Sequence, residues 1–256
     1  MSTQYEDVVI TSGMTLESDV RYNNVILQSG IVNLNGYAMH VYGNLIQAGG
    51  TMTIGGGTLV VNGDYRIQGI ADGKLSKPTG EGTSEGNLYM QDDNDYVLVY
   101  GDFVMNSKWY HDSIYGGDAK IHRGILEVKG NFSQYGSWNS ANHNSYSARN
   151  FGAGGTHKVV LSGEKQQIVH FDSPTNSQFN CLEIKNGLIV FDNVCVKEIA
   201  SDAKILSADN AFDINLNGFS LDIENDVKMT SGTIKINGGN LTVNNLIQSA
   251  GTINVG

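Results

Sequence analysis

Apolar side chains recur at an interval of 20 residues near both ends of the chain. In each repeat, two short stretches carry an apolar residue at every second position, as in a β-strand with one buried face. The recurring sets are Val32, Leu34, Met39 and Val41 with Met52, Ile54, Leu59 and Val61, and Ile214, Leu216, Leu221 and Ile223 with Ile234, Ile236, Leu241 and Val243. A fixed period of this length is typical of a solenoid in which each repeat forms one coil.

Turn residues separate the two strands of each repeat. They are Asn35-Gly36, Gly55-Gly56, Asn217-Gly218 and Asn237-Gly238, which are residue types that accept a positive φ. At equivalent positions of successive coils, Asn217 and Asn237 are expected to stack as a ladder. Their predicted role is structural.

A glycine followed by a short polar residue comes after the second strand of most coils. The pairs are Gly43-Asn44, Gly63-Asp64, Gly101-Asp102, Gly130-Asn131 and Gly163-Glu164. We interpret each pair as a sharp corner, in which the glycine adopts a strained backbone and the polar side chain hydrogen-bonds to it. A third short strand is expected to follow, as in Asn44-Leu45-Ile46-Gln47 and Asn245-Leu246-Ile247-Gln248.

Three strands per repeat and no helical periodicity predict an all-β fold. The expected architecture is a single-stranded, right-handed parallel β-helix with about 20 residues per coil and roughly ten coils. One domain then spans residues 1–256. One coil cannot fold alone, because its few buried side chains do not offset the entropy of ordering it.

The regular spacing is interrupted by three segments, near residues 69–95, 106–124 and 136–157. Each follows a third strand and precedes the next Gly-polar corner. Because they share one place in the coil, we expect them to emerge on the same side and form a single loop face.

Aromatic and histidine residues are concentrated in the second and third insertions. Exposed aromatic rings beside polar groups are suited to stacking on a sugar. The candidate ligand-binding residues are Trp109, Tyr110, His111, Trp138, His143 and Tyr146, and His122 and His157 lie beside them. The alternative is that Trp109 and Trp138 pack the loops onto the wall of the helix.

Evidence for catalysis in the sequence is weak, and no catalytic residue is assigned. The nearest approach to the carboxylate and basic cluster of a polysaccharide lyase is His111, Asp112, Lys120, His122 and Arg123. No strand shows the facing pair of carboxylates that glycoside hydrolysis requires.

No metal site or cofactor is predicted. Asp92-Asp93-Asn94-Asp95 lacks the spacing of a calcium loop, so we interpret it as a solvated turn. Cys181 and Cys195 occupy similar places in successive coils; two free thiols are favoured over a disulfide, and their spacing is not that of a zinc site.

Charge and hydropathy narrow the range of partners. The formal net charge of −10 and the lack of a basic run argue against nucleic acid as a partner. No apolar stretch is long enough for membrane insertion, and the N-terminus lacks the apolar core of a signal peptide. The last residues, 251–256, stop midway through a repeat, so we expect a fragment of a longer protein with neighbouring domains.

Two stretches resemble known β-helix repeats. The rhythm Gly-Thr-x-x-Ile-x-Gly-Gly-x-Leu-x-Val, within residues 25–68 and 210–256, resembles the repeats of filamentous-haemagglutinin-type adhesins. The segment from Gly154 to Gln167, GGTHKVVLSGEKQQ, is similar to β-helix stretches of Gram-positive surface or polymorphic-toxin-like proteins. These resemblances imply a stalk or display scaffold located outside the cell or on its surface.

The expected function is therefore that of a non-enzymatic segment of a bacterial surface or secreted protein, acting as a rigid spacer. Its loop face is the expected contact for a glycan or a surface protein. The alternative is a polysaccharide lyase or glycoside hydrolase that acts on the same face.

Overall fold

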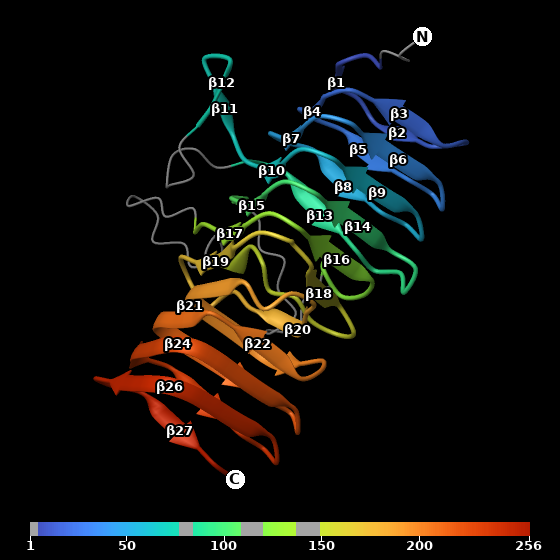
Figure 1. Ribbon diagram of the computed structural model, residues 1–256. Coiled ribbons are helices and arrows are strands. Elements are labelled where there is room, and N and C mark those ends of the chain that lie inside the picture. Colours follow the sequence, from blue (N-terminus) through green and yellow to red (C-terminus); the bar gives the residue numbers. More distant parts are fainter. Residues whose placement is uncertain (1–4, 77–83, 109–119, 137–148) are drawn as a thin grey trace.

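Short parallel strands stack coil upon coil in the computed structural model, which describes residues 5–76, 84–108, 120–136 and 149–256 (Figure 1). They form a β-solenoid of about 11 turns with a spacing of about 20 residues, which confirms the predicted fold class. The described residues contain no α-helix. The coils have three faces, which we call face 1, face 2 and face 3; the chain passes through them in the order face 1, face 3, face 2.

Face 1 carries the strand that follows each Gly-polar corner. Its pairing is parallel: Leu45 pairs with Tyr65, which pairs in turn with Phe103. The strands of face 1 are β1 (Val8–Ile10), β4 (Val25–Leu27), β7 (Leu45–Gln47), β10 (Tyr65–Ile67), β15 (Phe103–Met105), β17 (Phe132–Gln134), β19 (Gln167–Phe171), the first parts of β21 (Ile189–Ile199) and β23 (Ser207–Asn215), and the last parts of β24 (Ser220–Ser231) and β26 (Asn240–Gln248).

Face 2 carries the strand that precedes each corner. Met39 pairs with Leu59, and Leu59 pairs with Val97. The strands of face 2 are β3 (Val20–Tyr22), β6 (Ala38–Val41), β9 (Thr58–Val61), β14 (Tyr96–Val99), β16 (Ile125–Val128), β18 (Lys158–Leu161), β20 (Phe179–Ile184), β22 (Ala203–Ile205) and the first parts of β24 and β26.

Face 3 lies between face 1 and face 2 along the chain. In its middle, isolated bridges such as Met90 to Ile121 replace regular strands, and the later parts of β21 and β23 continue it. Its remaining strands are β2 (Met14–Thr15), β5 (Ile31–Asn33), β8 (Thr51–Thr53), β13 (Asn87–Tyr89), β25 (Thr233–Lys235) and β27 (Thr252–Asn254).

The core is a continuous column of inward side chains from all three faces. Aliphatic residues fill it toward both ends, whereas stacked phenylalanines fill the middle coils. The ring centroids of Phe103 and Phe132 lie 5.4 Å apart, and those of Phe132 and Phe171 lie 5.3 Å apart. Each ring therefore packs on the ring of a neighbouring coil, within the 4.5–7 Å that aromatic pairs prefer.

A ladder of Asn and Asp side chains runs along the corner between face 2 and face 1. In each step, the side-chain Oδ1 of one residue accepts a hydrogen bond from the backbone N–H of the equivalent residue in the next coil, at 2.8–3.1 Å. We call this the corner ladder; its members are Asp7, Asn24, Asn44, Asp64, Asp102, Asn131 and Ile168. The polar residue of four predicted corners, Asn44, Asp64, Asp102 and Asn131, thus bonds to the following coil. Glu164 of the fifth predicted corner is not part of the ladder, which ends at the backbone N–H of Ile168.

The corner glycines differ from the prediction of a strained backbone. Gly43, Gly63, Gly101, Gly130 and Gly163 are not among the residues with positive φ. A Cβ at Gly101 would lie 2.4 Å from Asp64 Oδ1 and 2.6 Å from the backbone of Gly63. Glycine is needed because the preceding coil approaches the backbone too closely for any side chain.

The turn asparagines match the prediction of an accessible positive φ. Asn35, Asn217 and Asn237 have φ values of 51°, 51° and 45°. The Nδ2 group of Asn237 donates to Asn215 Oδ1 at 2.9 Å, so the side-chain contact joins Asn237 to Asn215 and not to Asn217. The asparagines of this turn therefore connect neighbouring coils, with a different partner from the one expected.

The insertions are shorter than the sequence predicted. Residues 87–89, placed inside the first insertion, form β13 and pair with β8 on face 3. Ile121 bridges to Met90, and Gly152 bridges to Gln178, so parts of the other two predicted insertions also belong to the wall. After β10, the first insertion begins with a hairpin of β11 (Ile70–Ala71) and β12 (Lys74–Leu75).

His157 lies in the core, although the sequence grouped it with the loop histidines. Its side chain is fully buried, and neither ring nitrogen has a hydrogen-bond partner among the described residues. The ring packs edge-on against Phe151, with 6.2 Å between centroids. Burial lowers the pKa of His157 to about 3, because the apolar surroundings disfavour the imidazolium.

The close approach at the corner can be tested with one substitution made at two glycines. Gly101→Asn should lower the free energy of unfolding by about 1–3 kcal/mol, because its side chain has no space. Gly36→Asn should cost less than about 1 kcal/mol, because Gly36 has a φ of +83° and open space around it, and Asn tolerates that conformation. Denaturant unfolding followed by circular dichroism measures both. Equal losses would contradict the packing explanation and favour backbone strain.

The buried imidazole predicts a loss of stability in acid. Between about pH 6.5 and pH 3 the unfolded chain binds a proton that the folded chain does not bind at His157. The free energy of unfolding should therefore fall by about 2–3 kcal/mol from this group between pH 7 and pH 4.5. His157→Leu should remove that part of the pH dependence, whereas His40→Gln, on the outer wall, should keep it. Unfolding midpoints at both pH values give the answer; an unchanged dependence in His157→Leu would refute the assignment.

Candidate functional site

The loop face predicted from the sequence lies largely outside the described residues. Trp109, Tyr110, His111, Trp138, His143 and Tyr146 all fall there, as does Asp112. The structure does describe the segments that flank these loops. Those segments leave face 1 and rejoin face 3 at one corner of the solenoid.

A buried polar seam joins the flanking segments to one another. Ser84 bridges to Ser107, and Ser107 Oγ donates to the carbonyl of Gly86 at 2.6 Å. Asn150 Nδ2 donates to the carbonyl of Ser107 at 3.0 Å, while Asn150 Oδ1 accepts from Gln134 Nε2 at 2.8 Å. These side chains are fully buried and hydrogen-bonded, so the described ends of the insertions are anchored to the wall.

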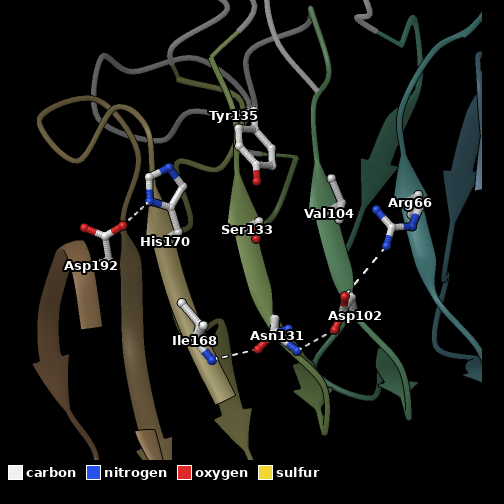
Figure 2. Close-up of a pocket in the computed structure, with 9 residues that line it drawn as sticks. All are labelled: Arg66, Asp102, Val104, Asn131, Ser133, Tyr135, Ile168, His170 and Asp192. Atoms are coloured by element: carbon white, nitrogen blue, oxygen red, sulfur yellow. Dashed lines mark hydrogen bonds and ion pairs between the residues drawn. The ribbon is translucent and has the colours of Figure 1, made fainter. Parts of the chain in front are cut away.

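A groove of about 450 Å³ lies on the outer surface of face 1, across the middle coils (Figure 2). This volume falls within the roughly 300–1,000 Å³ typical of ligand sites. We call it the face 1 groove. Its lining residues are Arg66, Asp102, Val104, Asn131, Ser133, Tyr135, Ile168, His170 and Asp192.

Strand register places five of these side chains in one row. Arg66 pairs with Val104, and successive strands add Ser133, His170 and Asp192 at the same position. Alternation along each strand points this position outward, because its neighbours on either side face the core. The row therefore brings together residues from coils that lie far apart in the sequence.

Arg66 occupies one end of the groove beside two members of the corner ladder. Its Nη2 lies 2.7 Å from Asp64 Oδ2 and 3.7 Å from Asp102 Oδ2. Asp64 and Asp102 are stacked neighbours, and like charges at that separation repel each other. The guanidinium offsets this repulsion, which gives Arg66 a structural role.

His170 and Asp192 form a pair at the other end of the groove. His170 Nδ1 lies 2.9 Å from Asp192 Oδ2, and Asn210 Nδ2 donates to Asp192 Oδ1 at 2.7 Å. The ring of Tyr135 lies beside the imidazole, with 5.6 Å between centroids. Both oxygens of Asp192 are thus engaged, and the imidazole is held in one orientation.

Three polar groups in the groove have no hydrogen-bond partner among the described residues. The Ser133 hydroxyl, the Tyr135 hydroxyl and His170 Nε2 make no hydrogen bond to any residue that the structure describes. Figure 2 shows the Ser133 side chain on β17, the Tyr135 side chain just beyond the end of that strand, and His170 on the adjacent strand β19. They form a local set of unused donors and acceptors that faces the groove.

The carboxylates of the groove do not form the arrangement of a glycoside hydrolase. Asp192 lies on β21, and Asp102 directly precedes β15, which is three strand steps away, or ~14 Å at about 4.8 Å per strand. An inverting pair needs roughly 6.5–9.5 Å and a retaining pair about 5–5.5 Å. Both carboxylates also hydrogen-bond to neighbouring coils.

The described members of the predicted lyase cluster lie on another part of the molecule. Lys120 Nζ donates to Asn87 Oδ1 at 2.6 Å, and Arg123 pairs with Asp93 at 2.9 Å. His122 directly follows Ile121, which bridges to Met90 on face 3, and the backbone N–H of His122 donates to the carbonyl of Met90. These residues are therefore not lining the face 1 groove.

The acidic segment forms a hydrogen-bonded turn in which Asp92, Asp93 and Asn94 are exposed, whereas Asp95 is buried, so the prediction of a solvated turn is wrong for Asp95. Asp95 Oδ1 accepts from the backbone N–H of Gly56 at 2.7 Å, and its Oδ2 accepts from Asp92 N–H at 3.0 Å. Burial raises the pKa of Asp95 despite these bonds. Among the described residues, no group of three or more His, Cys, Asp or Glu side chains could hold a metal ion.

The two cysteines are free and lie on different faces. Cys181 is on face 2, where it pairs with Lys158, whereas Cys195 is on face 3, where it pairs with Asp213. The expectation that they stack as neighbours is wrong, because β20 and β21 pair in a register that places Glu198, and not Cys195, opposite Cys181. Burial raises the pKa of the Cys195 thiol to about 12, so it is a poor nucleophile near neutral pH.

Sequence reasoning did not identify the face 1 groove. A signal was present: the outward residue of the strand after the corner is Ile26 and Ile46 in early coils, and Arg66 in the next. A change from apolar to polar at an outward position marks a surface with a different role. The unequal coil lengths concealed the later members of the row.

Comparisons with protein-family models, curated proteins and solved structures found no match. In the part of the chain that the structure describes, no helix has the length and apolar character needed to cross a membrane.

Asn131 tests whether the corner ladder stabilises the wall at the groove. Asn131→Ala removes the acceptor of the Ile168 N–H bond, which is 2.8 Å long, and should lower the free energy of unfolding by about 1–2 kcal/mol. Asn131→Asp retains the acceptor oxygen but stacks a third carboxylate on Asp102, so it should recover part of that loss, and more of it at high salt, where the repulsion is screened. Urea unfolding of both variants at low and high salt provides the measurement. If Asp is as destabilising as Ala at high salt as well, the hydrogen bond is not the source of the effect.

Proposed function

We propose that the chain is a non-enzymatic β-helix scaffold of a bacterial surface or secreted protein. It holds the insertions on one side of a rigid rod, where they contact a glycan or another surface protein. The observation that carries the proposal is the unbroken parallel stack of about 11 turns. At about 4.8 Å per coil, it spans roughly 50 Å.

Two features indicate that the solenoid is a rigid rod and not a flexible spacer. The corner ladder links consecutive coils through backbone hydrogen bonds, and the aromatic core links the same coils from inside. In a stack of this kind each coil is held by both neighbours. The buried seam of Ser84, Ser107 and Asn150 then fixes the described ends of the insertions.

The charges and distances at the face 1 groove, which is separate from the loop face, do not suit an enzymatic site there. Cleavage of an acidic polysaccharide calls for cationic side chains, but Arg66 in this groove is paired with Asp64. The separation of Asp102 and Asp192 does not suit hydrolysis. A non-catalytic role accounts for both observations.

The proposal is tested with a glycan array and with product analysis. The purified chain is expected to bind at least one glycan without releasing products from acidic polysaccharides such as polygalacturonate. Trp109→Ala and Trp138→Ala should each weaken binding about tenfold or more, because the loss of a stacked ring costs about 1.4 kcal/mol or more. Circular dichroism should show the wild-type β-content in both variants.

Release of unsaturated oligosaccharides would contradict the proposal and establish a lyase. Binding that both tryptophan variants retain would remove the loop face as the contact. Tyr37→Ala, at an exposed tyrosine in a turn of the wall, is the matched control and should leave binding unchanged.

A further inference from the structure

The face 1 groove contains polar groups that the scaffold does not use. Ser133 lies on β17, Tyr135 directly follows β17, and His170 lies on the adjacent strand β19. Their side-chain polar atoms named above have no hydrogen-bond partner among the residues that the structure describes. Asp192 positions the imidazole through Nδ1, which leaves Nε2 facing away from the carboxylate (Figure 2). These donors and acceptors thus lie close together and make no hydrogen bond that stabilises the described part of the fold.

The solenoid itself does not require polar residues in this row. Ile26 and Ile46 occupy the same outward position in earlier coils, and both are compatible with the wall. Branched apolar side chains are also better suited to strands than serine. The polar set is therefore not required by the fold and is available to a ligand.

Apolar surface lies directly beside these groups. Ile168 is 44% exposed and lines the groove, and the Tyr135 ring is half-buried against His170. A ligand that suits this surface has both hydroxyl groups and C–H faces. That combination is the chemistry of a sugar ring.

The charge of the lining selects against acidic sugars. Asp102 and Asp192 outnumber Arg66, whose guanidinium is already bound to Asp64. A polyanion would meet these carboxylates without a free cation to balance its charge. The oxygens of Asp192 are also both engaged, so a cationic ligand gains no unpartnered carboxylate there.

We infer that the face 1 groove is a binding site for an uncharged oligosaccharide. Ser133, the Tyr135 hydroxyl and His170 Nε2 bond to sugar hydroxyls, and Tyr135 and Ile168 contact the sugar faces. Because the row from Arg66 to His170 spans three strand steps, or ~14 Å, the site accommodates more than one sugar unit. The site is formed by strands of the wall, so it is independent of the proposed loop-face contact.

Isothermal titration calorimetry of the full chain tests this site. The probes are cellohexaose, xylohexaose, mannohexaose, maltohexaose and the hexamer of N-acetylglucosamine, with hexagalacturonate as the acidic comparison. At least one neutral probe should bind, and hexagalacturonate should bind at least tenfold more weakly. Ser133→Val, Tyr135→Phe and His170→Gln should each weaken the neutral probe at least fivefold.

Tyr100→Phe is the matched control for Tyr135→Phe. Tyr100 is 47% exposed, follows β14 of face 2 and does not line the groove, so its loss of a hydroxyl should change affinity by less than twofold. Thermal unfolding by circular dichroism shows that each variant is folded. Tyr135→Phe and Ser133→Val are small changes, and they keep the test valid if His170→Gln proves unstable.

Three results would overturn the inference. They are the absence of binding to every neutral probe, tighter binding of hexagalacturonate, and unchanged affinity in the folded groove variants. If the Trp109→Ala or Trp138→Ala variant loses binding while the groove variants retain it, the loop face is the site and the groove is not. Loss of binding in the groove variants alone supports the groove and leaves the loop-face proposal without support.

Discussion

The spacing of about 4.8 Å between equivalent positions of consecutive coils constrains the whole structure. Every residue of the wall lies against its own counterpart in the coil before and the coil after. Each side chain must therefore pack against the equivalent residue of the adjacent coil, hydrogen-bond to it, or be small enough to avoid a clash with it. The corner glycines avoid such a clash, because at Gly130 a Cβ would lie 2.3 Å from the carbonyl oxygen of Gly101. The residues of the corner ladder hydrogen-bond to their counterparts in the next coil, and the phenylalanines of the core pack on theirs.

The same constraint creates conflicts when stacked residues carry like charges. On one side, the backbone N–H of Asp64 donates to Asn44, which is neutral. On the other side, the Asp64 carboxylate is stacked next to the acidic residue Asp102. Arg66, two residues along, reaches both carboxylates. An outward cation on face 1 is therefore a consequence of two successive acidic corners. It also places the first charged residue at the edge of the groove.

The fold could be predicted from the sequence because the repeat is a local signal. Val32 and Met52, or Ile214 and Ile234, are separated by 20 residues and occupy paired positions in the structure. The corner was also recognisable, but the reason for its glycine was not, since close approach by another coil leaves no mark within one repeat. His157 shows the same limit: its position beside a loop indicated a surface residue, while its burial depends on the surrounding coils.

The groove could not be predicted because its residues have no regular spacing in the chain. Arg66, Val104, Ser133, His170 and Asp192 are separated by 38, 29, 37 and 22 residues, yet they form one row. Insertions alter the length of the connecting segments without altering the strand register.

The wall can therefore carry a site assembled from distant segments. In a β-helix, only the inward positions are required for the core. The outward row is free to change from Ile46 to Arg66 and on to His170, and each change affects only one rung. A recognition surface can thus be placed on the rod without disturbing the stacking that keeps it rigid. This separation explains why unpartnered polar groups and an unbroken core occur in the same coils.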